Sequence, residues 1–137
     1  MGSLNAPEEL RRQLEVVGTT VESERGTFLF RRGDQVSGVF LIAGGTVRLG
    51  LERDARGFPS RYLGAGAVIG LPAALSDSTY SLTAEVVEDA RVIFVRRDCL
   101  LNLLGERPSL CFHAMNMLTE ELVETRQALE RVHKGAS

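Results

Sequence analysis

The stretch GAVIGLPAALSDSTYSLTA, residues 66–84, decides the fold of this chain. It begins with a short apolar strand at 67–69 and then reaches Gly70, a residue type that adopts backbone dihedrals closed to the others. Pro72 suits the first turn of a helix, because its φ is already helical and its missing N–H needs no partner there. Helix formers and then a Ser-Asp-Ser turn follow, so the stretch predicts about one helical turn before a second apolar–polar run begins at Tyr80.

A glycine turn that opens so short a helix has a chemical consequence. Its first N–H groups have no intrahelical partner, and such groups can hold an anion. The backbone from Gly70 through Leu71 and Pro72 to Ala73 is therefore a candidate anion cradle. A helical corner in a β-barrel, with no ligand role, explains the same pattern and stays open.

The composition narrows the class of protein. A chain of 137 residues, 44% hydrophobic, can bury one core, and its 14 glycines suit a fold with many tight turns. A net charge of −2 argues against direct contact with nucleic acid, which favours a basic face. No apolar run approaches the length of a membrane span and no signal-peptide segment is evident, so we expect a cytoplasmic protein without a membrane partner. Cys99 and Cys111 lack metal or redox spacing and indicate thiols in a reducing compartment.

The apolar pattern divides the chain into three parts of one domain. Residues 1–18 predict a helical segment, because Leu10, Leu14 and Val17 repeat at helical spacing. Residues 19–97 change to a period of two, and about eight short strands with turn signals between them predict a jelly-roll barrel. The expected strands are 19–22, 27–30, 38–43, 46–52, 60–64, 67–69, 81–87 and 91–96, with turns that include Gly44-Gly45 and Glu88-Asp89.

Residues 98–137 return to a helical period. Asp98 is the expected N-cap of a short helix that ends near Gly105, and a long helix is expected at 108–133. Its heptad a/d positions form an apolar seam that favours a parallel homodimer. The seam residues are Cys111, Met115, Leu118, Leu122, Thr125, Leu129 and Val132. A second apolar face, at Leu110, Ala114 and Met117, is confined to the first half and is expected to dock on the barrel. The alternative, a single amphipathic helix packed on its own domain, explains an apolar stripe but not why the stripe continues to Val132.

The order helix, barrel, buried short helix and long helix resembles the cyclic nucleotide-binding domain. Residues 26–34 (GTFLFRRGD) are similar to the family's opening hairpin, and residues 39–47 (VFLIAGGTV) are similar to its next strand pair. The stretch 66–84 lies where the phosphate-binding cassette belongs. The nearest resemblance is to sensor domains of the catabolite activator and fumarate–nitrate regulator (Crp/Fnr) type. It implies an α+β fold, a jelly-roll barrel with a short N-terminal and a long C-terminal helix, and a non-enzymatic homodimeric sensor domain in transcription regulation.

The resemblance also implies which residues meet a ligand. Cyclic-nucleotide binders in the family carry a glutamate after the cassette glycine and an arginine near the cassette's end, where this sequence has Leu71 and, with one deletion, Tyr80. Ser81 keeps the small hydroxyl residue that follows, and the backbone cradle at residues 70–73 needs no side chain. Thr125 falls where a threonine contacts adenine in the catabolite activator, although a tolerated seam threonine is equally compatible. Because charge-assisted hydrogen bonds contribute about 1.5–3 kcal/mol each, we expect weak cyclic-nucleotide binding or a more apolar effector.

Other classes of function fit less well. A metal-dependent enzyme on a jelly roll needs histidines and a carboxylate on facing strands, but His113 and His133 both fall on the terminal helix. A haem or iron–sulfur sensor needs a cysteine cluster or an axial ligand, so no metal or other cofactor is expected. The sequence ends at Ser137, before a helix-turn-helix would fit, so direct DNA contact is not expected from this chain. The sensory domain is the favoured function, and the alternative is a ligand-free protein-interaction and dimerisation module that has lost nucleotide binding.

Overall fold

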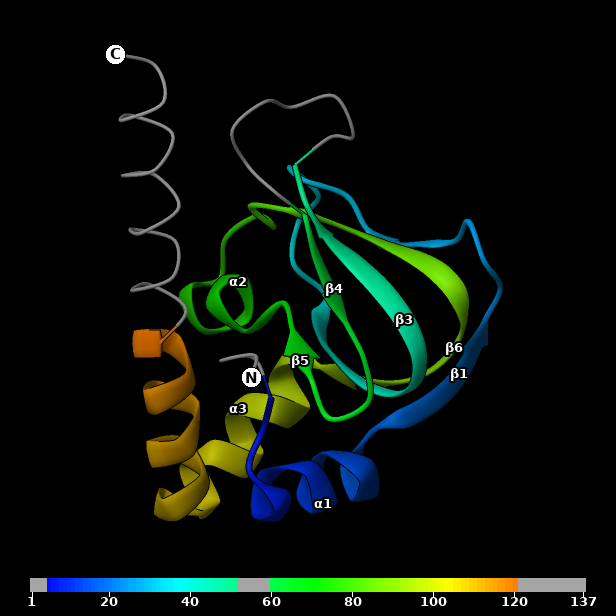
Figure 1. Cartoon of the computed structure of the whole chain (residues 1–137). Helices are drawn as coiled ribbons and strands as arrows, with labels where there is room; N and C mark the ends of the chain where they lie inside the picture. The colour runs from blue at the N-terminus through cyan, green and yellow to red at the C-terminus, as the bar shows by residue number, and fades with distance from the viewer. Residues whose placement is uncertain (1–4, 52–59, 121–137) are drawn as a thin grey trace.

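A computed structural model describes residues 5–51 and 60–120 and shows an α+β fold (Figure 1). The elements are α1 (Glu8–Val17), β1 (Thr19–Ser23), β2 (Phe28–Phe30), β3 (Gly38–Gly50), β4 (Arg61–Leu63), β5 (Val68–Ile69), α2 (Leu71–Ser76), β6 (Thr83–Arg96) and α3 (Arg97–Glu106). A further helix covers residues 108–120 and is called the C-terminal helix below.

The strands form one six-stranded antiparallel sheet that curls on itself (Figure 1). Its order is β1-β6-β3-β4, with β2 also paired to β6 and β5 also paired to β3. Among the described strands, β1 and β4 end this order without pairing to each other, so the sheet is curled but open. The sheet confirms the predicted jelly-roll type of fold and sets α1, α3 and the C-terminal helix below and beside it (Figure 1).

The number of strands differs from the prediction. The expected strands at 38–43 and 46–52 belong to one strand, β3, and those at 81–87 and 91–96 belong to β6. The predicted reversals at Gly44-Gly45 and Glu88-Asp89 are therefore wrong. The chain bends there instead, and the β3–β6 register shifts on both sides of Gly44. Gly45 has φ +82°, and a Cβ there would lie 2.4 Å from the Asp89 carbonyl oxygen, so the glycine permits a bulge between closely packed strands.

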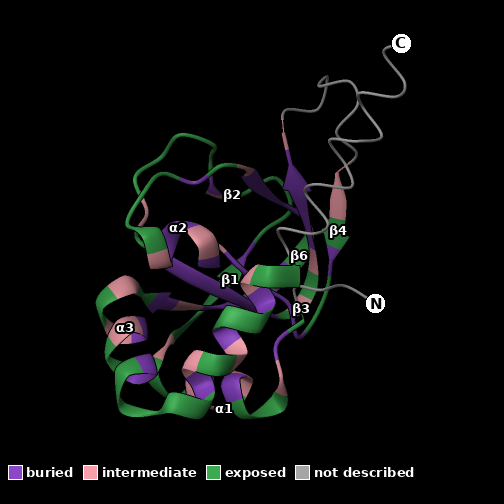
Figure 2. Cartoon of the chain, turned by 90° about the vertical axis from the view of Figure 1, so that its left-hand side faces the viewer, coloured by how far each residue is buried: buried purple, intermediate pink, exposed green. Residues whose placement is uncertain are grey.

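Alternating residues of the sheet serve two separate cores. Val39 and Leu41 of β3 face the helices, whereas Phe40 and Ile42 face the interior of the curl. Figure 2 shows buried residues along the strands and on the inward faces of the helices. We call the second group the interior cluster; its buried members are Phe30, Phe40, Ile42, Val47, Leu49, Leu63, Ala67, Ile69, Ala73, Tyr80, Ala84, Val86, Ala90 and Val92. We call the other group, which lies between the outer face of the sheet and the helices, the helix-side cluster. Its buried members are Ala6, Leu10, Leu14, Val39, Leu41, Val68, Leu71, Ala74, Ile93, Val95, Leu100, Leu103, Leu104, Leu110, Ala114 and Met117.

The buried face of α1 and the start of α3 differ from the prediction. Leu10 and Leu14 of α1 are buried as predicted, but Val17 is 38% exposed and does not join the core. Helix α3 begins directly after β6, with Arg96 in an extended conformation as its N-cap residue. The predicted N-cap at Asp98 is wrong, because the strand enters the helix without a loop. Asp98 lies in the first turn instead, where its carboxylate accepts a 2.9 Å hydrogen bond from the Cys99 N–H.

The C-terminal helix docks on its own domain through one face. Leu110, Ala114 and Met117 are buried in the helix-side cluster, which confirms the predicted second apolar face. Of the predicted seam, Cys111 and Leu118 are partly buried against this cluster, while Met115 is 60% exposed. The other predicted seam residues, Leu122, Thr125, Leu129 and Val132, lie outside the described residues.

Candidate functional site

The predicted cassette forms the turn and short helix that the sequence indicates. Gly70 has φ +88°, and a Cβ there would lie 3.1 Å from Cε1 of Tyr80 and 3.2 Å from the Gly38 carbonyl oxygen. The position requires glycine both for its backbone conformation and for the close approach of Tyr80. Helix α2 ends at Ser76, and Asp77 follows in the left-handed conformation with φ 51°.

The backbone cradle has fewer donors than an ordinary helix start. Pro72 is the second residue of α2 and contributes no N–H, so the first turn offers the N–H groups of Leu71 and Ala73. The next N–H, of Ala74, donates to the Gly70 carbonyl at 3.1 Å. An anion at this turn would therefore meet two backbone donors.

Leu71 and Tyr80 belong to different cores. The Leu71 side chain is 3% exposed and packs in the helix-side cluster, together with leucines of α3. Tyr80 and Ala73 belong to the interior cluster. The structure thus places Leu71 and Tyr80, which the resemblance predicted at the glutamate and arginine positions, in two different clusters.

Tyr80 fixes the end of the cassette to the start of β3. Its ring stacks on Phe30, with ring centroids 3.8 Å apart and an 11° angle between the planes. Its hydroxyl donates to the Gly38 carbonyl at 2.7 Å and accepts from the N–H groups of Ser37 and Gly38, both at 3.2 Å. These contacts occupy both the ring and the hydroxyl in a structural role that the sequence did not reveal.

The remaining predicted ligand side chains are those of Ser81 and Thr125. Ser81 is exposed, and Thr125 lies outside the described residues. Beyond the cassette, Thr83 accepts a 3.0 Å hydrogen bond from the Arg32 N–H and so joins β6 to the end of β2.

Two arginines that the sequence analysis did not single out, Arg97 and Arg48, make hydrogen bonds to the cassette or next to it. The Arg97 Nε donates to the Ala74 carbonyl at 2.7 Å and lies 3.7 Å from Oδ1 of Asp77, so Arg97 holds the C-terminal end of α2. On the other side of the sheet from the interior, Arg48 donates to Oε1 of Glu85 at 3.3 Å and to Oγ of Ser60 at 2.8 Å. On a half-buried strand, an arginine that alternates with apolar residues, as Arg48 does between Val47 and Leu49, normally faces solvent. Arg48 is only 6% exposed, and its buried charge is balanced by Glu85, which is 4% exposed.

The interior itself is apolar and aromatic. Phe30 lies 5.9 Å from Phe40, and Phe40 lies 5.0 Å from Phe94, measured between ring centroids. The cassette that borders it has no lysine, arginine or histidine between residues 66 and 84. An interior of this composition suits an apolar or aromatic group better than a bare phosphate.

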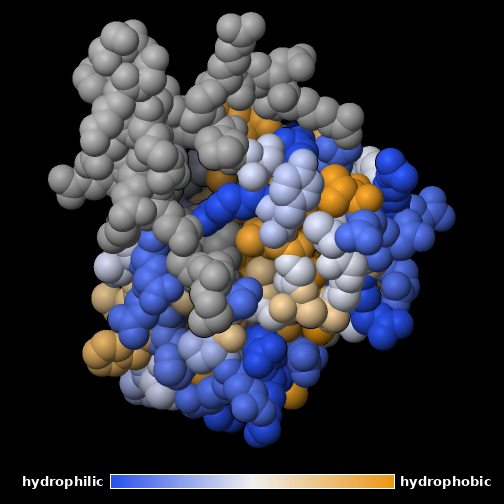
Figure 3. Space-filling model, viewed as in Figure 1, coloured by the Kyte–Doolittle hydropathy of each residue, from blue (hydrophilic) through white to orange (hydrophobic). Residues whose placement is uncertain are grey.

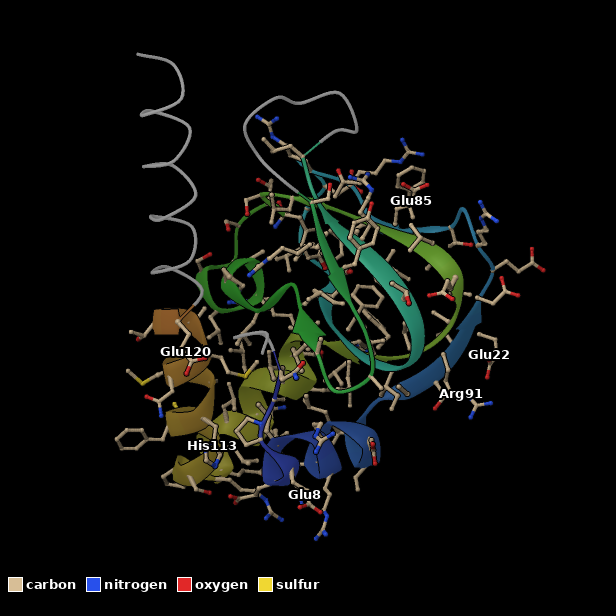
Figure 4. All side chains as sticks on the ribbon, viewed as in Figure 1. Glu8, Glu22, Glu85, Arg91, His113 and Glu120 are labelled. Carbon is tan, nitrogen blue, oxygen red and sulfur yellow. The ribbon has the colours of Figure 1, made fainter. Side chains whose placement is uncertain are left out.

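A polar cluster connects α1 with the C-terminal helix at the edge of the domain. The Glu9 carboxylate accepts a 2.8 Å hydrogen bond from Oγ of Ser109 and lies 3.3 Å from Nε2 of His113 (Figure 4 labels His113). Hydrogen bonds from Ser109 and His113, with nearby positive charge at Arg107, lower the pKa of Glu9. The other predicted histidine, His133, lies outside the described residues.

Metal-binding clusters and membrane-spanning helices are both absent from the described residues. Those residues include no group of three or more His, Cys, Asp or Glu that could hold a metal ion. None of their helices is long and apolar enough to cross a membrane. Cys99 and Cys111 are partly buried free thiols.

A curled antiparallel sheet that carries a glycine-opened short helix and is flanked by a docked C-terminal helix defines a domain of the jelly-roll type. The chain belongs to the cyclic nucleotide-binding domain family, whose model matches residues 20–107. Within that family it is of the Crp/Fnr type. Domains of this type are regulatory and are not typically enzymes.

Relatives support this assignment. The chain is 28% identical over 116 residues to the anaerobic regulatory protein of Bacillus subtilis, a match that covers 83% of this chain and 49% of that protein. The catabolite activator protein of Thermus thermophilus superposes with a TM-score of 0.77 at 25% identity, covering 94% of this chain and 62% of the other. A structure from work on a cyclic-GMP-dependent signalling pathway in bacterial phytopathogenesis superposes with a TM-score of 0.75 at 24% identity. This match covers 86% of this chain and 94% of the other. The chain thus spans about half the length of its curated relative.

Proposed function

We propose that this chain is the effector-sensing domain of a transcription regulator, and that its effector is a small molecule held in the interior of the curled sheet. The observation that carries the proposal is the cassette turn at Gly70, which has φ +88° and opens the short helix α2, while Leu71 and Tyr80 are both buried in structural contacts. The resemblance implies that Leu71 and Tyr80 stand where cyclic-nucleotide binders carry their glutamate and arginine, while the backbone turn needs neither side chain.

Binding of cyclic AMP or cyclic GMP is expected to be weak. Two charge-assisted hydrogen bonds of about 1.5–3 kcal/mol each are absent from the cassette, which corresponds to about two to four decades of affinity. Neither Leu71 nor Tyr80 supplies a replacement charge. The aromatic interior around Phe30 and Phe40 supports an effector more apolar than a cyclic nucleotide.

The proposed unit of function is a homodimer in the cytoplasm. Met115 is exposed beside the partly buried Cys111 and Leu118, all on the predicted seam of the C-terminal helix. A groove of about 450 Å³ on the same face is lined by Leu104, Pro108, Cys111, Phe112 and Met115. Association through this face would cover apolar surface that a single copy exposes. Contact with DNA would belong to a part of the regulator outside this chain.

A second candidate is a dimerisation module that binds no ligand. The stack of Tyr80 on Phe30 favours it, because these rings already fill space inside the curl.

The first of two measurements tests the proposed change of ligand, and the second separates the candidates. The first is titration calorimetry with cyclic AMP and cyclic GMP, where we expect dissociation constants weaker than about 100 µM. Micromolar or tighter binding would contradict the proposed change of ligand. The second is native mass spectrometry of the purified protein, where a small molecule released on denaturation supports an effector. Protein that carries no ligand, and that shows no thermal shift with a metabolite library, would favour the ligand-free module.

A further inference from the structure

One row of residues crosses the interior face of the sheet from the cassette side to the opposite edge. Phe30 of β2 is opposite Ala84 of β6, Ala84 is opposite Leu49 of β3, and Leu49 is opposite Arg61 of β4. Residues directly opposite each other in antiparallel strands lie on the same face. Phe30 in turn stacks on Tyr80, so the row begins at the cassette and ends at an arginine.

Burial places Arg61 on the inner face. The interior cluster includes the other members of the row, Phe30, Ala84 and Leu49. It also includes Leu63, which lies two positions after Arg61 and so faces the same side of β4. Tyr62, between Arg61 and Leu63, is 65% exposed on the other face of β4. Arg61 itself is partly buried at the edge of the interior cluster. A guanidinium in such a position favours an anionic partner, because a charge next to apolar surface is costly without one.

Other arginines near the cassette are engaged in different places. Arg48 is on the outer face and is bonded to Glu85 and Ser60. Arg97 holds the end of α2, and the guanidinium of Arg31 lies 4.0 Å above the ring of Phe28 on the outer face. Within this set, Arg61 is the cation that the register puts in the interior row.

We propose that Arg61 is the anion-binding residue of this domain, and that the ligand is an aromatic or apolar molecule with one anionic group. The anionic group would pair with the Arg61 guanidinium, whose planar donors suit a carboxylate, sulfonate or phosphate. The apolar part would lie along Leu49 and Ala84 toward the Phe30–Tyr80 stack. Arg61 already has an interaction within the protein, so the ligand's anion would share or displace it. The proposal rests on the proposed function, since it needs the interior to hold an effector.

The test compares two dyes that differ in charge. The probes are 8-anilinonaphthalene-1-sulfonate and its neutral counterpart N-phenyl-1-naphthylamine, measured by fluorescence on the full chain. Replacing Arg61 by Gln is expected to weaken the sulfonate at least about tenfold and to leave the neutral dye within about twofold, since only the former has a charge to pair. Arg61→Lys should retain part of the sulfonate affinity. The matched control is Arg91→Gln on β6, whose side chain is exposed and paired with Glu22 (Figure 4), and it should change neither affinity.

Each outcome decides the proposal. Equal affinities of wild type and Arg61→Gln for the sulfonate overturn it, and so does an equal loss of both dyes. No saturable binding of either dye by the wild type also overturns it. If native mass spectrometry still finds a bound small molecule in those cases, the effector-sensing function stands and the role of Arg61 falls. Circular dichroism of Arg61→Gln and Arg61→Lys checks that both variants fold.

Discussion

At the residue scale, the Tyr80 hydroxyl serves backbone groups of two residues at once. Replacing Tyr80 by Phe keeps the stack on Phe30 but leaves the Gly38 carbonyl and the neighbouring N–H groups without their partner. Buried groups left without hydrogen bonds cost about 1–3 kcal/mol, so we expect the free energy of unfolding to fall by that amount. Urea denaturation measures it. Tyr62→Phe is the matched control, because that tyrosine is 65% exposed and its loss should change stability little. Equal effects of the two variants would contradict the role given to Tyr80.

Gly70 supports a second prediction at this scale. Alanine at position 70 would have a positive φ and a Cβ 3.1 Å from the Tyr80 ring, so Gly70→Ala should lower stability by at least about 1 kcal/mol. Gly44→Ala is the control, because a Cβ there meets nothing within 4 Å and its φ is not positive. Thermal denaturation of both variants is the measurement. A Gly70→Ala protein as stable as the Gly44→Ala protein would show that the cassette turn relaxes easily.

At the element scale, Glu9 attaches α1 to the start of the C-terminal helix. Its pKa is lowered from the ordinary 4.5 by the bonds to Ser109 and His113, so the carboxylate stabilises the folded state above that value. This contribution is lost as the pH falls below 4.5 through the lowered folded-state pKa. We expect Glu9→Gln to reduce the urea midpoint at pH 7, and the difference from wild type to shrink as the pH falls below 4.5. Glu15→Gln, an exposed position on the same helix, is the control. A difference that persists unchanged at acidic pH would exclude the carboxylate as its source.

The same scale shows what the sequence could predict. The period of two and the turn residues correctly indicated the strands, and the Gly70-to-Asp77 pattern correctly indicated α2. Gly44-Gly45 was interpreted as a chain reversal. A local pattern cannot distinguish a turn from a bulge, because the bulge depends on the partner strand: Ala90 lies so close that a Cβ on Gly45 would be 2.6 Å from its Cα.

The site was less predictable for a related reason. The structural role of the Tyr80 hydroxyl depends on its bond to the Gly38 backbone, which is 42 residues away in the sequence. Similarly, the face of Arg61 follows from its pairing with Leu49, which no local spacing reveals.

At the scale of the whole molecule, polar and apolar surface are unevenly distributed. Hydrophilic residues cover much of the visible face, and hydrophobic ones gather over part of the sheet (Figure 3). On the C-terminal helix, Phe112 and Met115 are 70% and 60% exposed, although Leu110 and Ala114 on the same helix are almost fully buried. A helix that keeps large apolar side chains outside its own core favours association with a second surface.

The last prediction tests whether that surface is a second copy of this chain. Met115→Asp would place a charge in the predicted seam without touching the buried face of the helix, so the folded monomer should persist while the dimer dissociates. Light scattering at tens of micromolar measures the mass, which should fall from that of two chains to that of one. Asn116→Asp adds the same charge at the next exposed position, away from the seam, and should leave the mass unchanged. A wild type that is monomeric, or a Met115→Asp protein that keeps the mass of two chains, would remove the C-terminal helix from the interface. Because Leu118 also packs on its own domain, the exposed Met115 separates association from folding better than Leu118→Asp would.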